Sequence, residues 1–298
     1  MYKQSSLKNW FKSNPVFTYY VITFLISWGG LVLVVGGPGR VSSHPFNAPF
    51  LPLYFVTVAG PCIAGILLTG LYDGIKGYRE FFSRLVKWKV KANWYAAACL
   101  IAPLSVFAAL FVLSLFSPGF LPGIFSSGDN HIASMFGLTG NNRIMLFSFV
   151  LLLGLFNGFV EELGWTGFLT HRLKFKHSFI ATGINIGIMW GLWHLLSNYV
   201  GSAAGAGTVP LLLYIAVILF SFLPPFRILM IWVYENTGSV LIAILMHASL
   251  DVFWILSMPV VLTGQQRVTW YLVWASFLWV FVVTVIKIRS HLERPQNK

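Results

Sequence analysis

The chain has little charge and almost no cysteine. Only 9% of its 298 residues are charged, and its two cysteines are Cys62 and Cys99. Soluble domains carry about 25% charged residues, so this scarcity excludes a soluble enzyme. With 17% aromatic residues, the chain is also neither disordered nor a coiled coil. Because both cysteines lie inside apolar runs, they form no disulfide framework or four-thiolate metal site, and we expect no redox chemistry.

Long apolar runs dominate the rest of the sequence, in which 57% of residues are hydrophobic. A helix of roughly 20 such residues crosses a hydrocarbon core of about 30 Å. Eight runs reach this length, at about 16–37, 50–72, 94–116, 144–168, 179–199, 209–233, 240–258 and 269–287. They predict an all-α, polytopic membrane bundle of about eight transmembrane helices that forms a single membrane domain over residues 1–298. Pro224-Pro225 is expected to kink the sixth helix or to end it early.

Lysine and arginine are distributed unevenly between the segments that join these runs. Arg40, Arg143 and Arg267 stand on one side, and the other 17 of the 20 basic residues stand on the opposite side, among them Arg227, which is counted in the loop 225–239 that begins at the double proline. Cytoplasmic loops carry the excess of basic residues, so both termini are predicted to face the cytoplasm, in the cell membrane. The net charge of +12 then reflects topology and attraction to anionic lipids, and we expect no nucleic-acid partner.

A few ionisable residues stand inside the apolar runs, where they are unfavourable. A charge at the bilayer centre costs at least about 2.5–3.5 kcal/mol. The fourth run contains Glu161 and Glu162, the fifth contains His194, and the seventh contains His247 and Asp251. His247 and Asp251 are four residues apart, so they share one face of their helix. These five side chains are the candidate site.

Two glycine ridges indicate how the fourth and fifth spans pack. Gly154 and Gly158 lie one turn apart on the fourth span, and Gly183, Gly187 and Gly191 form a longer ridge on the fifth. Small residues let helices approach closely in lipid, so we expect these spans to touch and to bring a carboxylate to an imidazole. The spacing does not choose between the two glutamates. The histidine of the fifth span lies deeper, about 24 Å against about 13–15 Å, a difference that a tilted fifth span, or one that begins outside the membrane, would reconcile.

The candidate residues suit hydrolysis by two routes. Glu161, His194 and His247 form one of the three-ligand sets of catalytic zinc, which lowers the pKa of a bound water to about 7. The same residues suit a metal-free hydrolase in which a glutamate deprotonates water and a histidine stabilises the oxyanion. The HExxH signature of soluble metalloproteases is absent. A plainer interpretation is that these groups only form hydrogen bonds between helices.

Three short motifs carry a family resemblance. They are a double glutamate normally followed by an arginine, an aromatic residue four positions before a histidine, and a histidine four positions before asparagine or aspartate. In this chain they read Glu161-Glu162-Leu163-Gly164-Trp165-Thr166, Trp190-Gly191-Leu192-Trp193-His194 and His247-Ala248-Ser249-Leu250-Asp251. They resemble the motifs of the CPBP family of intramembrane proteases, which includes CAAX prenyl endopeptidases and bacteriocin-immunity proteins. The resemblance extends over about residues 50–258.

The resemblance implies roles for the motif residues. Glu161 would activate the attacking water with help from His194, Glu162 would support or share that role, and His247 and Asp251 would bind metal or stabilise the oxyanion. Two positions depart from the family pattern. Thr166 stands at the usual arginine position, so a pairing of that arginine with Glu162 is expected to be lost. Asp251 stands where asparagine is commoner, and it would have to be protonated, orient His247 or bind a cation.

The sequence therefore predicts an intramembrane endopeptidase that acts on a peptide or protein substrate at the membrane, with zinc as a possible cofactor. Two other functions stay open. A transporter could use intramembrane acids and histidines to relay protons or metal ions. A catalytically silent relative could act as a membrane binding scaffold, which the threonine at the arginine position makes plausible.

Overall fold

The structure is a computed structural model of the chain. It describes residues 10–35, 55, 57–125, 142–259 and 262–292. The regular elements in these ranges are all helical, which confirms the predicted all-α class. Arg40 and the segment 126–141, which are both predicted to lie on the side opposite the cytoplasm, fall outside the described residues.

Seven helical segments in the described part of the chain are long and apolar enough to cross a membrane, and they coincide with all predicted runs except the second. The polytopic membrane bundle is therefore confirmed. Its elements are α2 (Pro15–Val35), α4 (Gly60–Leu85), α5 (Ala92–Ser114), η3 (Pro118–Phe120), η4 (Gly123–Phe125), α7 (Arg143–Glu162), η5 (Leu163–Thr170), α8 (His171–Leu173), α9 (Phe179–Ala206), α10 (Leu211–Phe220), α11 (Leu223–Thr237), α12 (Val240–Ser257) and α13 (Gly264–Leu292).

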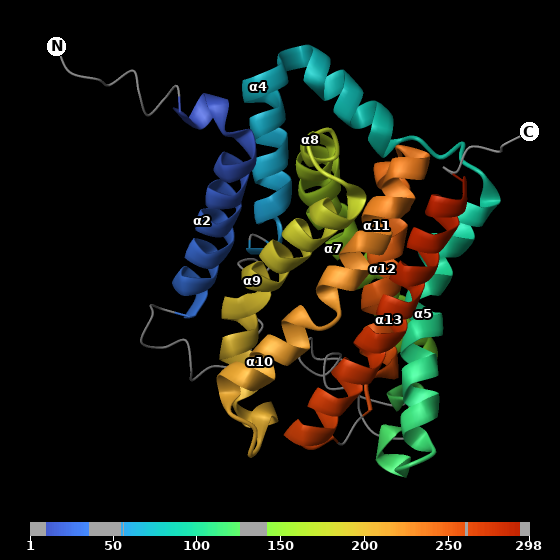
Figure 1. Ribbon diagram of the computed structural model, residues 1–298. Helices are drawn as coiled ribbons and strands as arrows, with labels where there is room; N and C mark the ends of the chain where they lie inside the picture. Colours follow the sequence, from blue (N-terminus) through green and yellow to red (C-terminus); the bar gives the residue numbers. More distant parts are fainter. Residues whose placement is uncertain (1–9, 36–54, 56, 126–141, 260–261, 293–298) are drawn as a thin grey trace, which may run out of the picture.

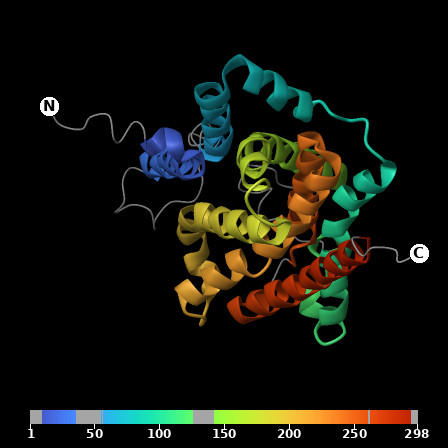
Figure 2. The same cartoon turned by 45° about the horizontal axis from the view of Figure 1, so that its top comes forward.

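The second predicted run lies partly outside the described residues, and its described part forms the first half of α4. At Gly74 the backbone leaves the helical region, with φ 61° and ψ −151°. Glycine adopts such a conformation without steric penalty, because it has no Cβ. The helix therefore bends at Gly74. Its second half leaves the bundle and runs across one end toward α5 (Figures 1 and 2).

The double proline divides the sixth predicted run into two helices. Proline has no N–H and suits the first turn of a helix, so α10 ends at Phe220 and α11 begins at Leu223, just before Pro224 and Pro225. The second helix continues to Thr237, where Gly238 caps it in the left-handed conformation. The predicted kink is confirmed. The segment after it is a buried helix rather than a loop.

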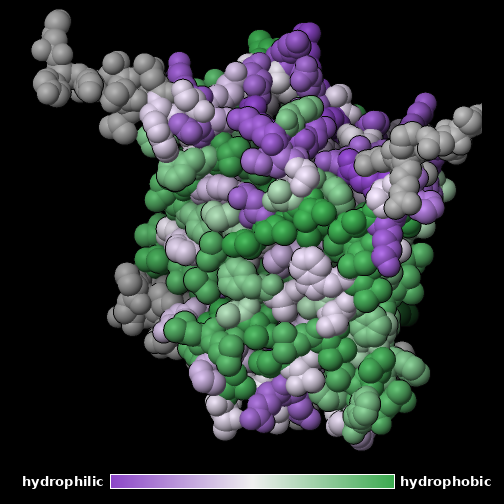
Figure 3. Space-filling view, viewed as in Figure 1, coloured by the Kyte–Doolittle hydropathy of each residue, from purple (hydrophilic) through white to green (hydrophobic). Residues whose placement is uncertain are grey.

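The start of α2 and the end of α13 lie at the same end of the bundle, beside the bent half of α4 (Figure 1). Hydrophilic residues gather at this end, and apolar residues cover the middle of the visible face (Figure 3). Arg84, Lys87 and Lys174 belong to this polar end; burial, with the neighbouring arginine, lowers the pKa of Lys174. This arrangement is that of a multi-pass integral membrane protein whose described chain ends lie on one side.

The glycine ridges pack closely, but not against each other. A Cβ at Gly158 would lie 2.7 Å from the carbonyl oxygen of Ile244 in α12, and a Cβ at Gly183 would lie 2.5 Å from the Cα of Ile228 in α11. The helix α7 therefore packs on α12, whereas α9 packs on α10 and α11. The prediction that the two ridges bring the fourth and fifth spans together is therefore wrong, although the two spans do touch where Trp190 of α9 contacts Glu161 of α7. The carboxylate meets an imidazole through the contact between α7 and α12 instead.

Substitution of Gly158 by alanine tests this packing. The added Cβ overlaps backbone atoms of α12, and overpacking costs about 1–3 kcal/mol, more than the gain in helix propensity of up to about 1 kcal/mol. We expect a lower melting temperature in detergent. The matched control is Gly29→Ala in α2, where a Cβ meets nothing within 4 Å and the melting temperature should be unchanged or higher. Equal melting temperatures for the two variants would contradict the proposed close approach of α7 and α12.

Candidate active site

The two glutamates are the last residues of α7, and the π-helix η5 follows them directly. A π-helix has a wider turn than an α-helix and occurs frequently at functional sites. In η5 the hydroxyl of Thr170 donates to the carbonyl of Trp165, five residues earlier. Gly164 lies so close to α4 that a Cβ there would stand 2.2 Å from the carbonyl oxygen of Pro61. The segment that carries the glutamates is therefore fixed by close packing.

Glu162 is fully buried, and both of its carboxylate oxygens are occupied. Nη1 of Arg227 donates to the two oxygens at 2.7 and 2.9 Å. The hydroxyl of Thr166 donates to Oε2, and Nδ1 of His247 lies 2.8 Å from Oε1. A buried carboxylate is tolerated when it is paired and hydrogen-bonded in this way. With both oxygens engaged, the carboxylate of Glu162 links the end of α7 to side chains of η5, α11 and α12.

Arg227 was not among the residues singled out from the sequence, because the predicted span boundaries place it in a loop. The structure corrects this assignment. Its side chain lies in α11 with 0% exposure, in a stretch that is apolar on both sides. One signal in the sequence could have identified Arg227. It is a basic residue among apolar neighbours, in a chain whose intramembrane glutamates have no basic partner within the predicted spans. Position 166 supplies no arginine to Glu162, as expected, but Arg227 provides a guanidinium partner from another helix.

The contact with Glu162 fixes the ring of His247. A carboxylate paired with an arginine is ionised and has no proton to donate. His247 must therefore be the donor in its contact with Glu162, so we assign its ring proton to Nδ1. The opposite nitrogen, Nε2, then faces two further carboxylates: Oε1 of Glu161 at 3.9 Å and Oδ1 of Asp251 at 3.8 Å. These separations are too long for a direct hydrogen bond.

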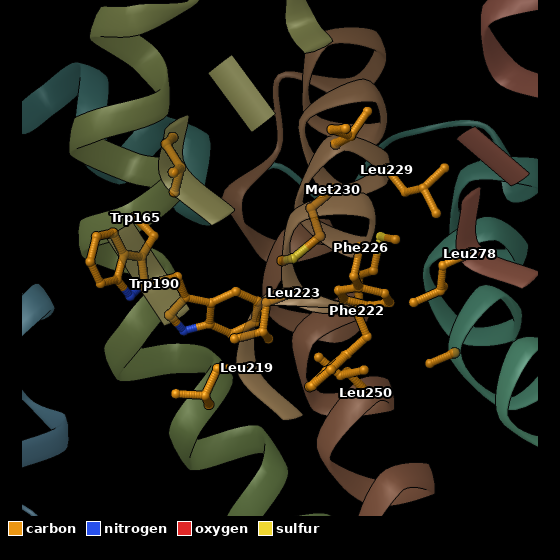
Figure 4. Packing of buried hydrophobic residues seen from close by; sticks show 14 of the residues in the cluster. Trp165, Trp190, Leu219, Phe222, Leu223, Phe226, Leu229, Met230, Leu250 and Leu278 are labelled. Carbon is orange, nitrogen blue, oxygen red and sulfur yellow. The ribbon is translucent and has the colours of Figure 1, made fainter. Parts of the chain in front are cut away.

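Trp190 connects the parts of the site. Its indole N–H donates to Oε2 of Glu161 at 2.8 Å, and its ring lies 5.1 Å from the ring of His247. The guanidinium of Arg227 stands 5.6 Å from the centre of the same indole. Figure 4 shows Trp190 pointing from α9 toward Leu223, on the helix that carries the arginine. Trp190 thus holds one oxygen of Glu161 and leaves the other, Oε1, directed at His247.

Asp251 lies at the accessible side of the site, with 14% of its side chain exposed. Nδ2 of Asn157 donates to its Oδ2 at 3.1 Å, so its other oxygen is directed toward His247. Because Glu162 occupies the Nδ1 side of His247, Asp251 faces the ring only at Nε2.

His194 lies beside the cluster rather than within it. Its ring is 5.8 Å from that of Trp190 and 4.6 Å from that of Trp193. Among the described residues it forms no hydrogen bond or ion pair with the two glutamates or His247. The helix that carries it, α9, runs obliquely across the bundle in Figure 1. The structure therefore brings four of the five predicted residues into one cluster and places the fifth at its edge.

The arrangement does not match the predicted zinc ligands. In the described part of the chain, no group of three or more His, Cys, Asp or Glu side chains is placed to hold a metal ion. Glu161 and His247 lie 3.9 Å apart, but Trp190 occupies one oxygen of the glutamate and His194 stands outside the cluster. These residues as arranged do not fit a three-ligand site. We derive no step through a metal ion, and zinc stays a prediction for a metal assay.

Comparison with known proteins agrees with this geometry. The family model described as Type II CAAX prenyl endopeptidase Rce1-like matches residues 143–253, which include all three motifs. The protein named "CAAX prenyl protease 2" of Methanococcus maripaludis is 22% identical over 239 residues, which cover 80% of this chain and 82% of the relative. Both matches support the predicted relationship to CPBP family proteases. They support a CAAX-type intramembrane protease.

The hydrogen bond from Trp190 to Glu161 can be tested by Trp190→Phe. The phenyl ring keeps the aromatic contact with His247 and loses the N–H donor. A hydrogen bond to a charged group is worth about 1.5–3 kcal/mol, so peptide cleavage should slow by about 10- to 100-fold. The matched control is Trp193→Phe, because Nε1 of this neighbouring tryptophan has no hydrogen-bond partner in the described structure. Similar cleavage rates for the two variants would show that the indole N–H has no role.

Proposed function

We propose that this protein hydrolyses a peptide bond of a membrane-associated substrate with a water molecule activated by Glu161 and His247. The observation that carries the proposal is the convergence of Glu161 Oε1 and Asp251 Oδ1 on Nε2 of His247, at 3.9 and 3.8 Å. A water molecule among these atoms is within hydrogen-bond reach of each. Its deprotonation by a carboxylate gives the nucleophile that amide hydrolysis requires.

The two fixed acceptors account for both hydrogens of the water. Nε2 of His247 accepts one, because Glu162 keeps the ring proton on Nδ1. Oε1 of Glu161 accepts the other and takes it up as the oxygen attacks the carbonyl carbon. The C–N bond then breaks, and Glu161 returns the proton to the leaving nitrogen. His194, partly exposed at the edge of the cluster, is the candidate donor to the developing oxyanion.

The substrate side of the proposal comes from the relatives. Their names refer to CAAX prenyl proteins, and we propose this class as the first substrate to test, presented as a peptide anchored in the membrane. The polar end of the bundle, with its basic residues, would face the cytoplasm and contact anionic lipids of the cell membrane. Both termini would then be cytoplasmic.

Glu161→Gln is the direct test of water activation. Glutamine keeps the acceptor for Trp190 but takes up no proton, so cleavage by purified protein in liposomes should fall by about 10²- to 10⁴-fold. His247→Ala should have a comparable effect, because it removes the second acceptor. The matched control is Glu235→Gln, at a glutamate that pairs with Arg289 outside the site, which should keep wild-type cleavage.

Wild-type turnover in both Glu161→Gln and His247→Ala would refute the proposal. Proton or metal-ion flux into liposomes without peptide cleavage would support the transporter. Unchanged cellular activity after replacement of Glu161, His194 and His247 together would support the silent scaffold.

Removal of metal tests the zinc prediction. Since the side chains as arranged do not form a three-ligand group, we expect protein dialysed against a chelator to keep its cleavage rate. Metal content is measured on the same sample. Loss of activity on chelation, restored by added Zn²⁺ and not by Mg²⁺, would instead establish a zinc enzyme.

A further inference from the structure

Arg227 joins the site to a helix that carries none of the family motifs. Nη1 donates to both oxygens of Glu162, and Nη2 donates to the hydroxyl of Thr166 at 3.1 Å. The same Nη1 lies 3.4 Å from the sulfur of Met230, and the guanidinium stands over the ring of Trp190. Since the side chain is completely buried, it contacts neither lipid headgroups nor water at the surface.

These contacts connect Arg227 to the reacting atoms through two side chains. Arg227 holds Glu162, Glu162 holds Nδ1 of His247, and His247 presents Nε2 to the proposed water. If Arg227 were absent, the buried carboxylate would lose its compensating charge and would move toward another donor or take up a proton. A protonated Glu162 is itself a donor, so it would no longer fix the proton of His247 on Nδ1.

We propose that Arg227 is a positioning residue for hydrolysis, which holds Glu162 so that His247 keeps its ring proton on Nδ1 and directs Nε2 at the reactive water. The inference rests on the proposed function. Arg227 touches neither substrate nor water, so its substitution should change the catalytic rate constant and leave substrate binding unaffected. The guanidinium partner of the double glutamate then comes from α11 and not from η5, where the family pattern has its arginine.

The position of Thr166 offers a test that separates positioning from general stability. Its hydroxyl bonds to both Glu162 and Arg227, so its side chain points at the guanidinium. An arginine at position 166 would reach the space left when the side chain of Arg227 is shortened. The double variant Thr166→Arg with Arg227→Met thus returns a guanidinium to Glu162 from the opposite side.

The experiment measures kcat, KM and melting temperature for three variants of the full-length protein in liposomes. Arg227→Lys keeps the charge but replaces the planar guanidinium with a single ammonium of shorter reach, so Glu162 is held less firmly and kcat should fall about 10-fold with KM unchanged. Arg227→Met should lower kcat by on the order of 10²- to 10⁴-fold, as when a catalytic histidine loses its orienting partner. The double variant should recover much of the kcat that Arg227→Met loses.

Two outcomes would overturn the proposal: wild-type kcat in Arg227→Lys, or a double variant that regains the wild-type melting temperature without regaining kcat. The control is Arg267→Met, at an arginine that donates to the hydroxyl of Tyr214, which should leave kcat unchanged. Glu161→Gln is measured alongside. If that variant is inactive while Arg227→Lys is normal, only the positioning role fails; if it is active, the proposed function fails.

Discussion

The buried ion pair between Arg227 and Glu162 is the interaction on which the rest of the site depends. Neither charge could lie alone in a lipid-embedded bundle, since removal of one partner from a buried pair costs about 3–5 kcal/mol. The pair ties α11 to the junction of α7 and η5, and its carboxylate also holds a histidine of α12. One contact thereby fixes three helices and the orientation of His247.

The backbone features of the chain place this pair at the right depth. The double proline ends α10 early and starts α11 inside the bundle, with Arg227 in its first turns. The bend between α10 and α11 lies against the glycines of α9, where Gly187 approaches the Cα of Pro224. The same close packing brings Trp190 of α9 to Glu161. The helix break, the glycine ridge and the aromatic link are therefore parts of one arrangement.

The two adjacent glutamates have different environments and, in our proposal, different roles. Glu162 has every oxygen engaged by side chains, whereas Glu161 has one oxygen held by Trp190 and one directed at His247. Neighbouring residues on a helix point about 100° apart, so a single pair of positions can supply both a structural anchor and a reactive carboxylate. Asp251 and His194 lie toward the accessible side, where a substrate would approach.

Much of this was predictable from the sequence, and the remainder depended on tertiary contacts. Apolar runs predicted the helices because membrane thickness fixes their length. The candidate residues were recognisable because ionisable groups are rare inside such runs. The choice between the glutamates, the partners of the glycine ridges and the π-helix could not be predicted, since each depends on which helix lies opposite. Arg227 was missed because counts of basic residues treat an arginine near the end of a span as part of a loop.

An experimental structure in lipid, resolved well enough to show ordered water, tests the central claim most directly. Our account predicts a water molecule within hydrogen-bond distance of Glu161 Oε1 and His247 Nε2, with Glu162 bound to Arg227 and to Nδ1 of His247. Density that places Glu162 against the water and turns Glu161 away from His247, or that separates Arg227 from Glu162, would contradict it.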